Sequence, residues 1–77
     1  MIDRIKKVIS QTFGISSVPD DLKINDIEQW SSLGQIQLML GIEEEFGIKI
    51  PTERLLYLTS VTKINEYLTE EVRDRNS

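Results

Sequence analysis

Residues 30–51 of the chain read WSSLGQIQLMLGIEEEFGIKIP, and this stretch decides the fold. Four of its apolar side chains recur at helical spacing, namely Leu38, Met39, Ile42 and Phe46. Their pattern predicts a helix that begins near Ser32 and ends at about Phe46. Gly47 is the expected stop, because glycine readily adopts the left-handed backbone that ends many helices.

The start of this helix contains two adjacent serines that compete for one role. Ser32 and Gln35 have the Ser-x-x-Gln spacing of a capping box, in which the hydroxyl accepts a backbone N–H and the glutamine reaches back. Ser31 could cap the helix instead, which would leave the Ser32 hydroxyl free. The sequence leaves both alternatives open.

The same helix carries more apolar surface than one buried face requires. Leu33, Ile36 and Leu40 recur at positions i, i+3 and i+7, so they form a second stripe, the apolar strip, beside the first. One interpretation is a central helix that is buried on two sides. The other is a partly exposed strip that receives a ligand or a partner.

Acidic residues gather in the same part of the chain. The net charge of the chain is −4, and residues 20–53, with eight acids and two bases, carry a charge of −6. A solvated acidic face is the simplest interpretation. An apolar strip beside acidic residues is also typical of a transient interface, and the partners that it predicts are basic. The negative charge argues against binding to nucleic acid, which attracts cationic side chains.

The rest of the chain predicts three further helices and a loop. Residues 2–13 have an amphipathic pattern that Gly14 ends, and a brief helix is expected to begin at Thr52. Residues 15–31 show no regular period and predict a long loop, whose apolar residues favour packing against the core. The apolar residues expected in the brief helix are Leu55, Leu56 and Leu58.

A last helix is expected to begin after a capping Thr59 or Ser60, and residues 73–77 are expected to fray. Its predicted inner side chains are Val61, Ile64, Leu68 and Val72. The fold class that follows is all-α. We expect one domain over residues 1–77, a four-helix bundle of three main helices plus one short helix, with a long ordered loop between the first two.

The side chains that the chain lacks restrict its chemistry. Its 77 residues include no cysteine and no histidine, which removes the usual general base near neutral pH and the usual ligands of structural zinc. The chain also has no glycine-rich phosphate loop. From these absences taken together, we expect neither a metal site nor enzymatic activity. Apolar runs are too short to span a membrane, and the residues after Met1 lack the pattern of a signal peptide, so we expect a cytoplasmic protein.

The stretch quoted above resembles the acyl carrier protein family. In that family an Asp-Ser-Leu motif opens the second helix, which ends in Glu-Glu-Glu-Phe or a close variant and leads into an Ile-x-Ile-Pro link. The matching residues here are Ser31-Ser32-Leu33, Glu43-Glu44-Glu45-Phe46 and Ile48-Lys49-Ile50-Pro51. The resemblance extends over the whole chain, because all the expected helices and the long loop fall in family order.

The resemblance implies that Ser32 is the attachment point for 4′-phosphopantetheine, which a phosphopantetheinyl transferase would transfer from coenzyme A. The thiol of this arm would hold an acyl or aminoacyl group as a thioester and present it to partner enzymes, which fits a chain without cysteine. The carrier is expected to be a monomer. The positions that in the family meet basic partner enzymes are Leu33, Ile36, Leu40, Glu43 and Glu44.

The chain departs from the family pattern beside the proposed attachment site. Ser31 replaces the usual Asp, and Gly34 and Gln37 stand where acids are common. These departures favour a specialised carrier, in a polyketide, nonribosomal-peptide or envelope-sugar acylation pathway, over the housekeeping carrier of fatty acid synthesis. The alternative is an unmodified helical interaction module that docks basic partners through its second helix.

Overall fold

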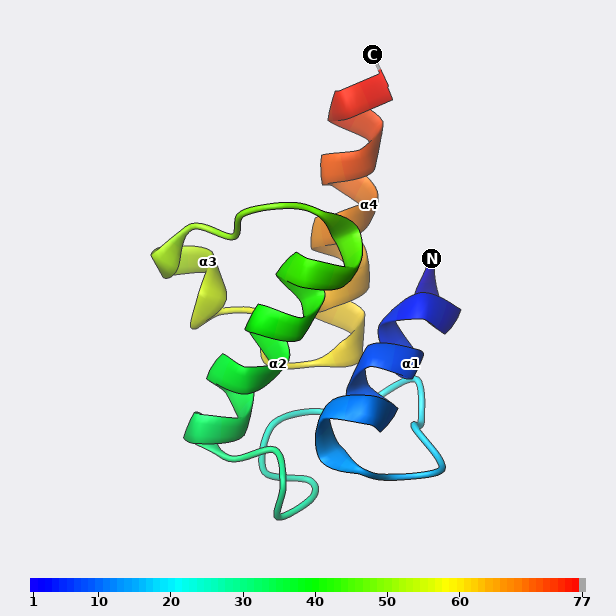
Figure 1. Cartoon of the computed structure of the whole chain (residues 1–77), viewed down its shortest axis with the longest axis vertical. Coiled ribbons are helices and arrows are strands. Elements are labelled where there is room, and N and C mark those ends of the chain that lie inside the picture. Colours follow the sequence, from blue (N-terminus) through cyan, green and yellow to red (C-terminus); the bar gives the residue numbers. More distant parts are fainter. Residues whose placement is uncertain (77) are drawn as a thin grey trace.

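The computed structural model describes the backbone of residues 1–76 and the side chains of residues 1–71. Within these residues it contains four helices: α1 (Ile2–Phe13), α2 (Ser32–Phe46), α3 (Thr52–Leu55) and α4 (Val61–Asn76) (Figure 1). No strand occurs in this part of the chain, in which Lys23 and Ser60 form an isolated antiparallel bridge. The all-α prediction is therefore confirmed.

Two glycines end the first two helices as predicted. Gly14 and Gly47 have φ angles of 66° and 65°, in the left-handed region where a residue with a Cβ is strained. The N–H of Gly14 donates to the carbonyl of Ser10, and that of Gly47 donates to the carbonyl of Glu43. The bounds predicted for these two helices are confirmed.

The last two helices differ in part from the prediction. Helix α3 begins at Thr52 but ends at Leu55, so the expected helical positions of Leu56 and Leu58 are wrong. Helix α4 continues to Asn76, past the point where fraying was expected to begin. Ser77 and the predicted inner side chain of Val72 lie outside the described residues.

Of the two caps considered for α4, the structure uses Ser60. The Ser60 hydroxyl accepts the N–H of Lys63 at 3.1 Å, two residues inside the helix that begins at Val61. The N–H of Ile64 donates to the Ser60 carbonyl at 3.0 Å, which begins the helical hydrogen-bond pattern. The Thr59 carbonyl instead accepts the N–H of Ile24, in the segment between α1 and α2.

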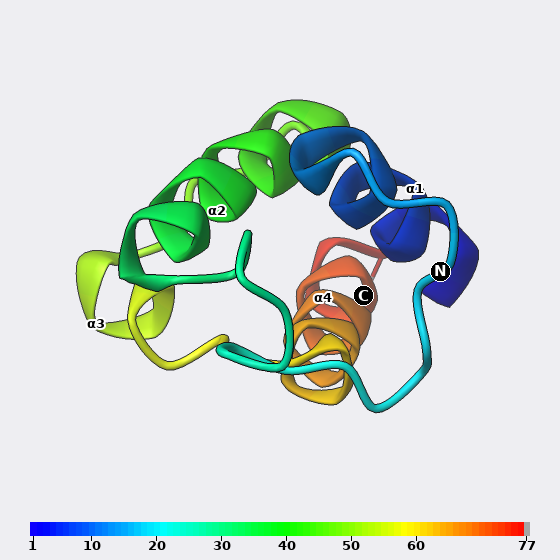
Figure 2. The ribbon, with the colours of Figure 1, turned by 90° about the horizontal axis from the view of Figure 1, so that it is seen from below.

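Helices α1, α2 and α4 surround one hydrophobic core. Viewed along α4, helices α1 and α2 lie side by side and α4 packs across the core from them (Figure 2). A Cβ added at Gly41 would lie 3.1 Å from Val8, so this glycine permits the close approach of α1 and α2. The buried apolar side chains are Ile5, Val8, Ile9, Phe13, Leu22, Trp30, Leu38, Met39, Ile42, Ile48, Ile50, Leu58, Val61, Ile64 and Leu68.

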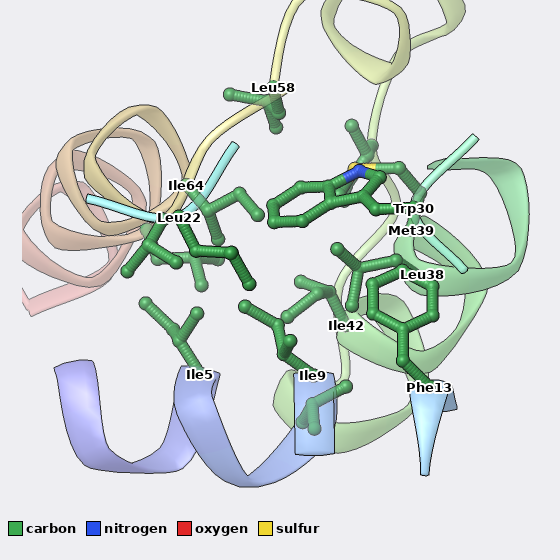
Figure 3. Close-up of a cluster of buried hydrophobic side chains, with 14 of the residues drawn as sticks. Ile5, Ile9, Phe13, Leu22, Trp30, Leu38, Met39, Ile42, Leu58 and Ile64 are labelled. Carbon is green, nitrogen blue, oxygen red and sulfur yellow. The ribbon is translucent and has the colours of Figure 1, made fainter. Parts of the chain in front are cut away.

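Trp30 lies in the middle of this core although it belongs to the segment before α2 (Figure 3). Its side chain is fully buried, and its ring centroid is 5.6 Å from that of Phe13. An aromatic pair at this separation stabilises the core beyond the burial of its area alone. Trp30 therefore anchors the end of the segment that leads into Ser31 and α2.

Backbone hydrogen bonds attach residues 14–31 to the beginning of α4. The N–H of Ile24 donates to the Thr59 carbonyl at 2.8 Å, and the N–H of Val61 donates to the Leu22 carbonyl at 2.9 Å. A tight turn follows, in which Asn25 has a φ of 72° and its N–H donates to the Trp30 carbonyl at 2.8 Å. Asparagine tolerates this left-handed backbone better than most residues. The turn fixes the backbone just before the serine pair.

An ion pair within this turn joins Lys23 to Asp26. The Lys23 ammonium lies 2.8 Å from one carboxylate oxygen of Asp26, and the Lys23 N–H donates to the other at 3.1 Å. The hydrogen bond from Lys23 lowers the pKa of Asp26, and the same hydrogen bond raises the pKa of Lys23. Both groups are exposed, so we assign them a local role in the turn.

Arg4 joins the N-terminal end of α1 to the C-terminal end of α2. Its guanidinium donates to the Glu45 carboxylate and to the Glu45 backbone carbonyl, each at 3.1 Å. The same group stacks over the Phe46 ring, 4.4 Å from the ring centroid. The positive charge also lies at the negative end of the α2 dipole, where a cation is stabilising.

Candidate functional site

Ser31, the first of the two adjacent serines, caps α2. Ser31 has extended backbone angles, φ −92° and ψ −173°, and its hydroxyl accepts the N–H of Gly34 at 3.3 Å. The first α-helical hydrogen bond runs from the N–H of Gln35 to the Ser31 carbonyl at 2.8 Å. Of the two alternatives that the sequence left open, Ser31 as the cap is therefore the one observed.

Ser32 is the first residue of α2 and is exposed. Among the residues that the structure describes, no group is hydrogen bonded to its hydroxyl. The capping box that its spacing to Gln35 suggested is wrong, because Gln35 points into the core instead of reaching back. The Ser32 hydroxyl is thus available to solvent at the positive end of a helix, where an attached anion is stabilised.

Gln35 is the polar side chain that sequence reasoning missed. It is only 2% exposed, and its Oε1 accepts the indole N–H of Trp30 at 2.7 Å. Its Nε2 donates to the backbone carbonyls of Leu55 and Leu58, at 2.9 and 2.8 Å. A signal was present in the sequence, because Gln35 lies one turn before Met39, on the core face of the helix.

Gly34 is required by the packing of the first turn of α2. A Cβ at this position would lie 2.1 Å from the Gln29 carbonyl oxygen and 3.1 Å from the Phe13 ring. The backbone before Trp30 therefore passes directly over the first turn of the helix. This contact gives a steric reason why position 34 carries no acidic side chain in this chain.

The apolar strip of Leu33, Ile36 and Leu40 is exposed. The three side chains are 66%, 44% and 57% exposed, whereas Leu38 and Ile42 on the other side of the helix are fully buried. The interpretation that α2 is buried on two sides is wrong. The strip leads away from Ser32 along the outer face of the helix, because positions 33, 36 and 40 share that face.

The two acidic residues assigned to partner binding have different environments. Glu44 is exposed and lies one turn beyond Leu40, so it continues the face that carries the apolar strip. Glu43 is half-buried, and one of its carboxylate oxygens accepts the N–H of Ile50 at 2.7 Å. Glu43 therefore has an internal role that the sequence did not predict, while its contact with a partner stays a prediction.

Neither a metal-binding cluster nor a membrane-spanning helix occurs among the described residues. The acidic side chains there include no group of three that is arranged to hold a metal ion. The helices described are all too short or too polar to cross a membrane. In comparisons with known proteins, no family model matches the chain, and no solved structure matches it.

Proposed function

We propose that this chain is an acyl carrier protein that bears 4′-phosphopantetheine on Ser32. The observation that carries the proposal is the pair of serines at the start of α2. The Ser31 hydroxyl caps the helix, and the neighbouring Ser32 hydroxyl is exposed and bound to no described residue. A hydroxyl that the fold does not use is one that a modifying enzyme can reach.

The residues around Ser32 suit a phosphodiester. The N–H groups of Ser32 and Leu33 belong to the first turn of α2, which has no intrahelical partner for them. These groups and the helix dipole favour a negative charge at this position. When attached, the arm would supply the thiol that the chain lacks, so that cargo is held as a thioester.

The surface beyond Ser32 supports docking to other proteins. The exposed strip of Leu33, Ile36 and Leu40 continues into the exposed Glu44, so apolar and acidic groups lie on one face. We propose that this face meets basic patches on the transferase and on the enzymes that load or receive the cargo. One carboxylate oxygen of Glu43 accepts the Ile50 N–H, so only the other oxygen is free to belong to the proposed surface.

The finer architecture and the setting also remain part of the proposal. Residues 1–77 would form a single carrier domain, a four-helix bundle with a long ordered loop between α1 and α2. We propose a monomeric cytoplasmic protein in a specialised pathway, of the polyketide, nonribosomal-peptide or envelope-sugar acylation kind. The replacement of the usual Asp by Ser31 is the feature that favours a specialised carrier.

Incubation with coenzyme A and a promiscuous phosphopantetheinyl transferase tests the modification. The wild-type chain should gain one phosphopantetheine, and Ser32→Ala should gain none. Ser31→Ala serves as the matched control, because it removes the adjacent hydroxyl and should still be modified. If Ser31→Ala blocks the reaction and Ser32→Ala does not, the attachment site is Ser31. If several transferases leave every variant unmodified, the unmodified interaction module replaces the carrier.

A further inference from the structure

The amide of Gln35 joins three parts of the chain in one fixed orientation. Its oxygen faces the Trp30 indole N–H, and both of its N–H groups face backbone carbonyls, those of Leu55 and Leu58. A flipped amide would place N–H against N–H and oxygen against two oxygens. Only one orientation therefore satisfies the donors and acceptors.

The segment that this amide holds is attached to the core through Leu55 and Leu58, and its Tyr57 ring contacts the Lys63 ammonium on α4, 4.7 Å from the ring centroid. Helix α3 has no buried residue, and in the segment after it Leu56 and Tyr57 are 65% and 54% exposed. Buried Ile50 and buried Leu58 bound this stretch, which we call the α3 segment (residues 51–58). At its beginning, the Glu43 carboxylate accepts the N–H of Ile50. The two polar side chains that secure its ends, Glu43 and Gln35, thus both come from α2.

We propose that Gln35 is a positioning residue that holds the α3 segment against Trp30. When the Gln35 hydrogen bonds break, the α3 segment separates from α2 and its short helix unfolds in the same event, because a single helical turn is not stable alone. Such an opening exposes the Trp30 indole N–H, because its acceptor, the Gln35 amide, is itself bonded to the Leu58 carbonyl. Trp30 and Leu58 belong to the same hydrophobic core (Figure 3). The turn before Ser31 and the position of α3 therefore depend on the same side chain. This device lies outside the modification of Ser32 and does not rest on it.

Native-state hydrogen exchange on the unmodified wild-type chain provides the first test. The N–H groups of Tyr57 and Leu58 donate to the Arg54 carbonyl, and the Trp30 indole N–H donates to Gln35. We expect these three protons to exchange through one common opening, which is more populated than the opening that exposes the core residue Ile9. If the indole proton exchanges only together with Ile9, the proposal is overturned.

Gln35→Glu provides the second test, because it keeps the shape of the side chain and changes its donors. An ionised Glu accepts the Trp30 N–H but repels the carbonyls of Leu55 and Leu58, whereas a protonated Glu can donate to one of them. Protection of residues 55–58 should fall by about 5–150-fold in the ionised form, as expected for losing a buried hydrogen bond. Protection should recover as the pH is lowered through the pKa of the new carboxyl, which burial raises.

Gln37→Glu is the matched control, with the same change of charge on the exposed side of α2. It should leave the protection of residues 55–58 and the Trp30 indole signal unchanged across the same pH range. The proposal fails if both variants behave alike, or if Gln35→Glu lowers protection in α1 as much as in the α3 segment. Should Gln35→Glu not fold, the wild-type exchange experiment still decides the question.

Discussion

The hydroxyl of Ser31 accepts the N–H of Gly34 at 3.3 Å, while its neighbour Ser32 begins the helix with a hydroxyl that bonds to no described residue. Of these two hydroxyls, that of Ser31 stabilises the start of the helix, and that of Ser32 is exposed to solvent. The division follows from backbone geometry, because only a residue in the extended conformation just before a helix can direct its oxygen at the N–H groups of the first turn.

Removal of the cap should cost stability without removing the proposed site. Ser31→Ala should lower the free energy of unfolding by about 0.5–2 kcal/mol, because it leaves the Gly34 N–H without its partner. Ser31→Asp restores both the capping oxygen and the residue usual in carrier proteins, so it should be at least as stable as the wild type. Urea denaturation of the three proteins measures this. Equal stability of Ser31→Ala and the wild type would contradict the assigned cap.

A side chain at position 34 should be poorly tolerated. Alanine has a higher helix propensity than glycine, but a Cβ here meets the Gln29 carbonyl oxygen at 2.1 Å. Gly34→Ala should therefore destabilise the chain by about 1–3 kcal/mol. Gly41→Ala, where the nearest atom is a Val8 side-chain carbon at 3.1 Å, should cost less. Thermal unfolding of both variants tests the difference, and a stabilised Gly34→Ala would show that the turn over α2 lies elsewhere.

The apolar strip should contribute to docking and little to folding. Leu40→Ala removes an exposed side chain and should change stability by no more than about 0.5 kcal/mol. Leu38→Ala, on the buried face of the same helix, should cost about 2–5 kcal/mol. Chemical denaturation distinguishes the two. If Leu40→Ala unfolds as readily as Leu38→Ala, the strip is part of the core.

Charge reversal at the two glutamates should separate docking from packing. Glu43→Lys loses the bond to the Ile50 N–H and should destabilise the chain, so a weaker reaction of this variant with a partner enzyme does not by itself report docking. Glu44→Lys should retain wild-type stability, raise the apparent KM of the modified protein with a partner enzyme, and leave kcat near its wild-type value. Salt should raise KM of the wild type in the same way, because the screening length falls to about 3 Å near 1 M.

Glu66→Lys is the control for this experiment, since it makes the same charge change at an exposed position on α4. It should leave KM and its salt dependence close to those of the wild type. If Glu66→Lys and Glu44→Lys change KM equally, KM depends on the net charge of the chain and not on the position of the charge. A loss confined to kcat would place the docking surface away from Glu44.

The periodic part of the fold was predictable from the sequence, and the polar contacts were not. The spacing of Leu38, Met39 and Ile42 predicted both the second helix and its buried face, because a 3.6-residue repeat leaves few alternatives. Gly14 and Gly47 marked the helix ends for an equally local reason. These predictions needed no knowledge of distant residues.

The internal contacts of Gln35 and Glu43 were missed because their partners lie outside α2, in the segments before and after it. A local rule assigned Gln35 to a capping box. In the core its amide instead accepts the Trp30 indole N–H and donates to the carbonyls of Leu55 and Leu58. The rule that places acids at the surface likewise missed the bond from the Ile50 N–H to Glu43. Contacts of this kind depend on tertiary packing, which local patterns do not specify.

The intact mass of the protein purified from its own cell tests the central claim most directly. The proposed function predicts a population heavier than the sequence mass by one phosphopantetheine arm, with or without cargo, and fragmentation should place the added mass on Ser32. Detection of only the unmodified sequence mass, under conditions in which the partner pathway is active, would contradict the carrier assignment. An arm found on Ser31 would show instead that the roles of the two serines are reversed.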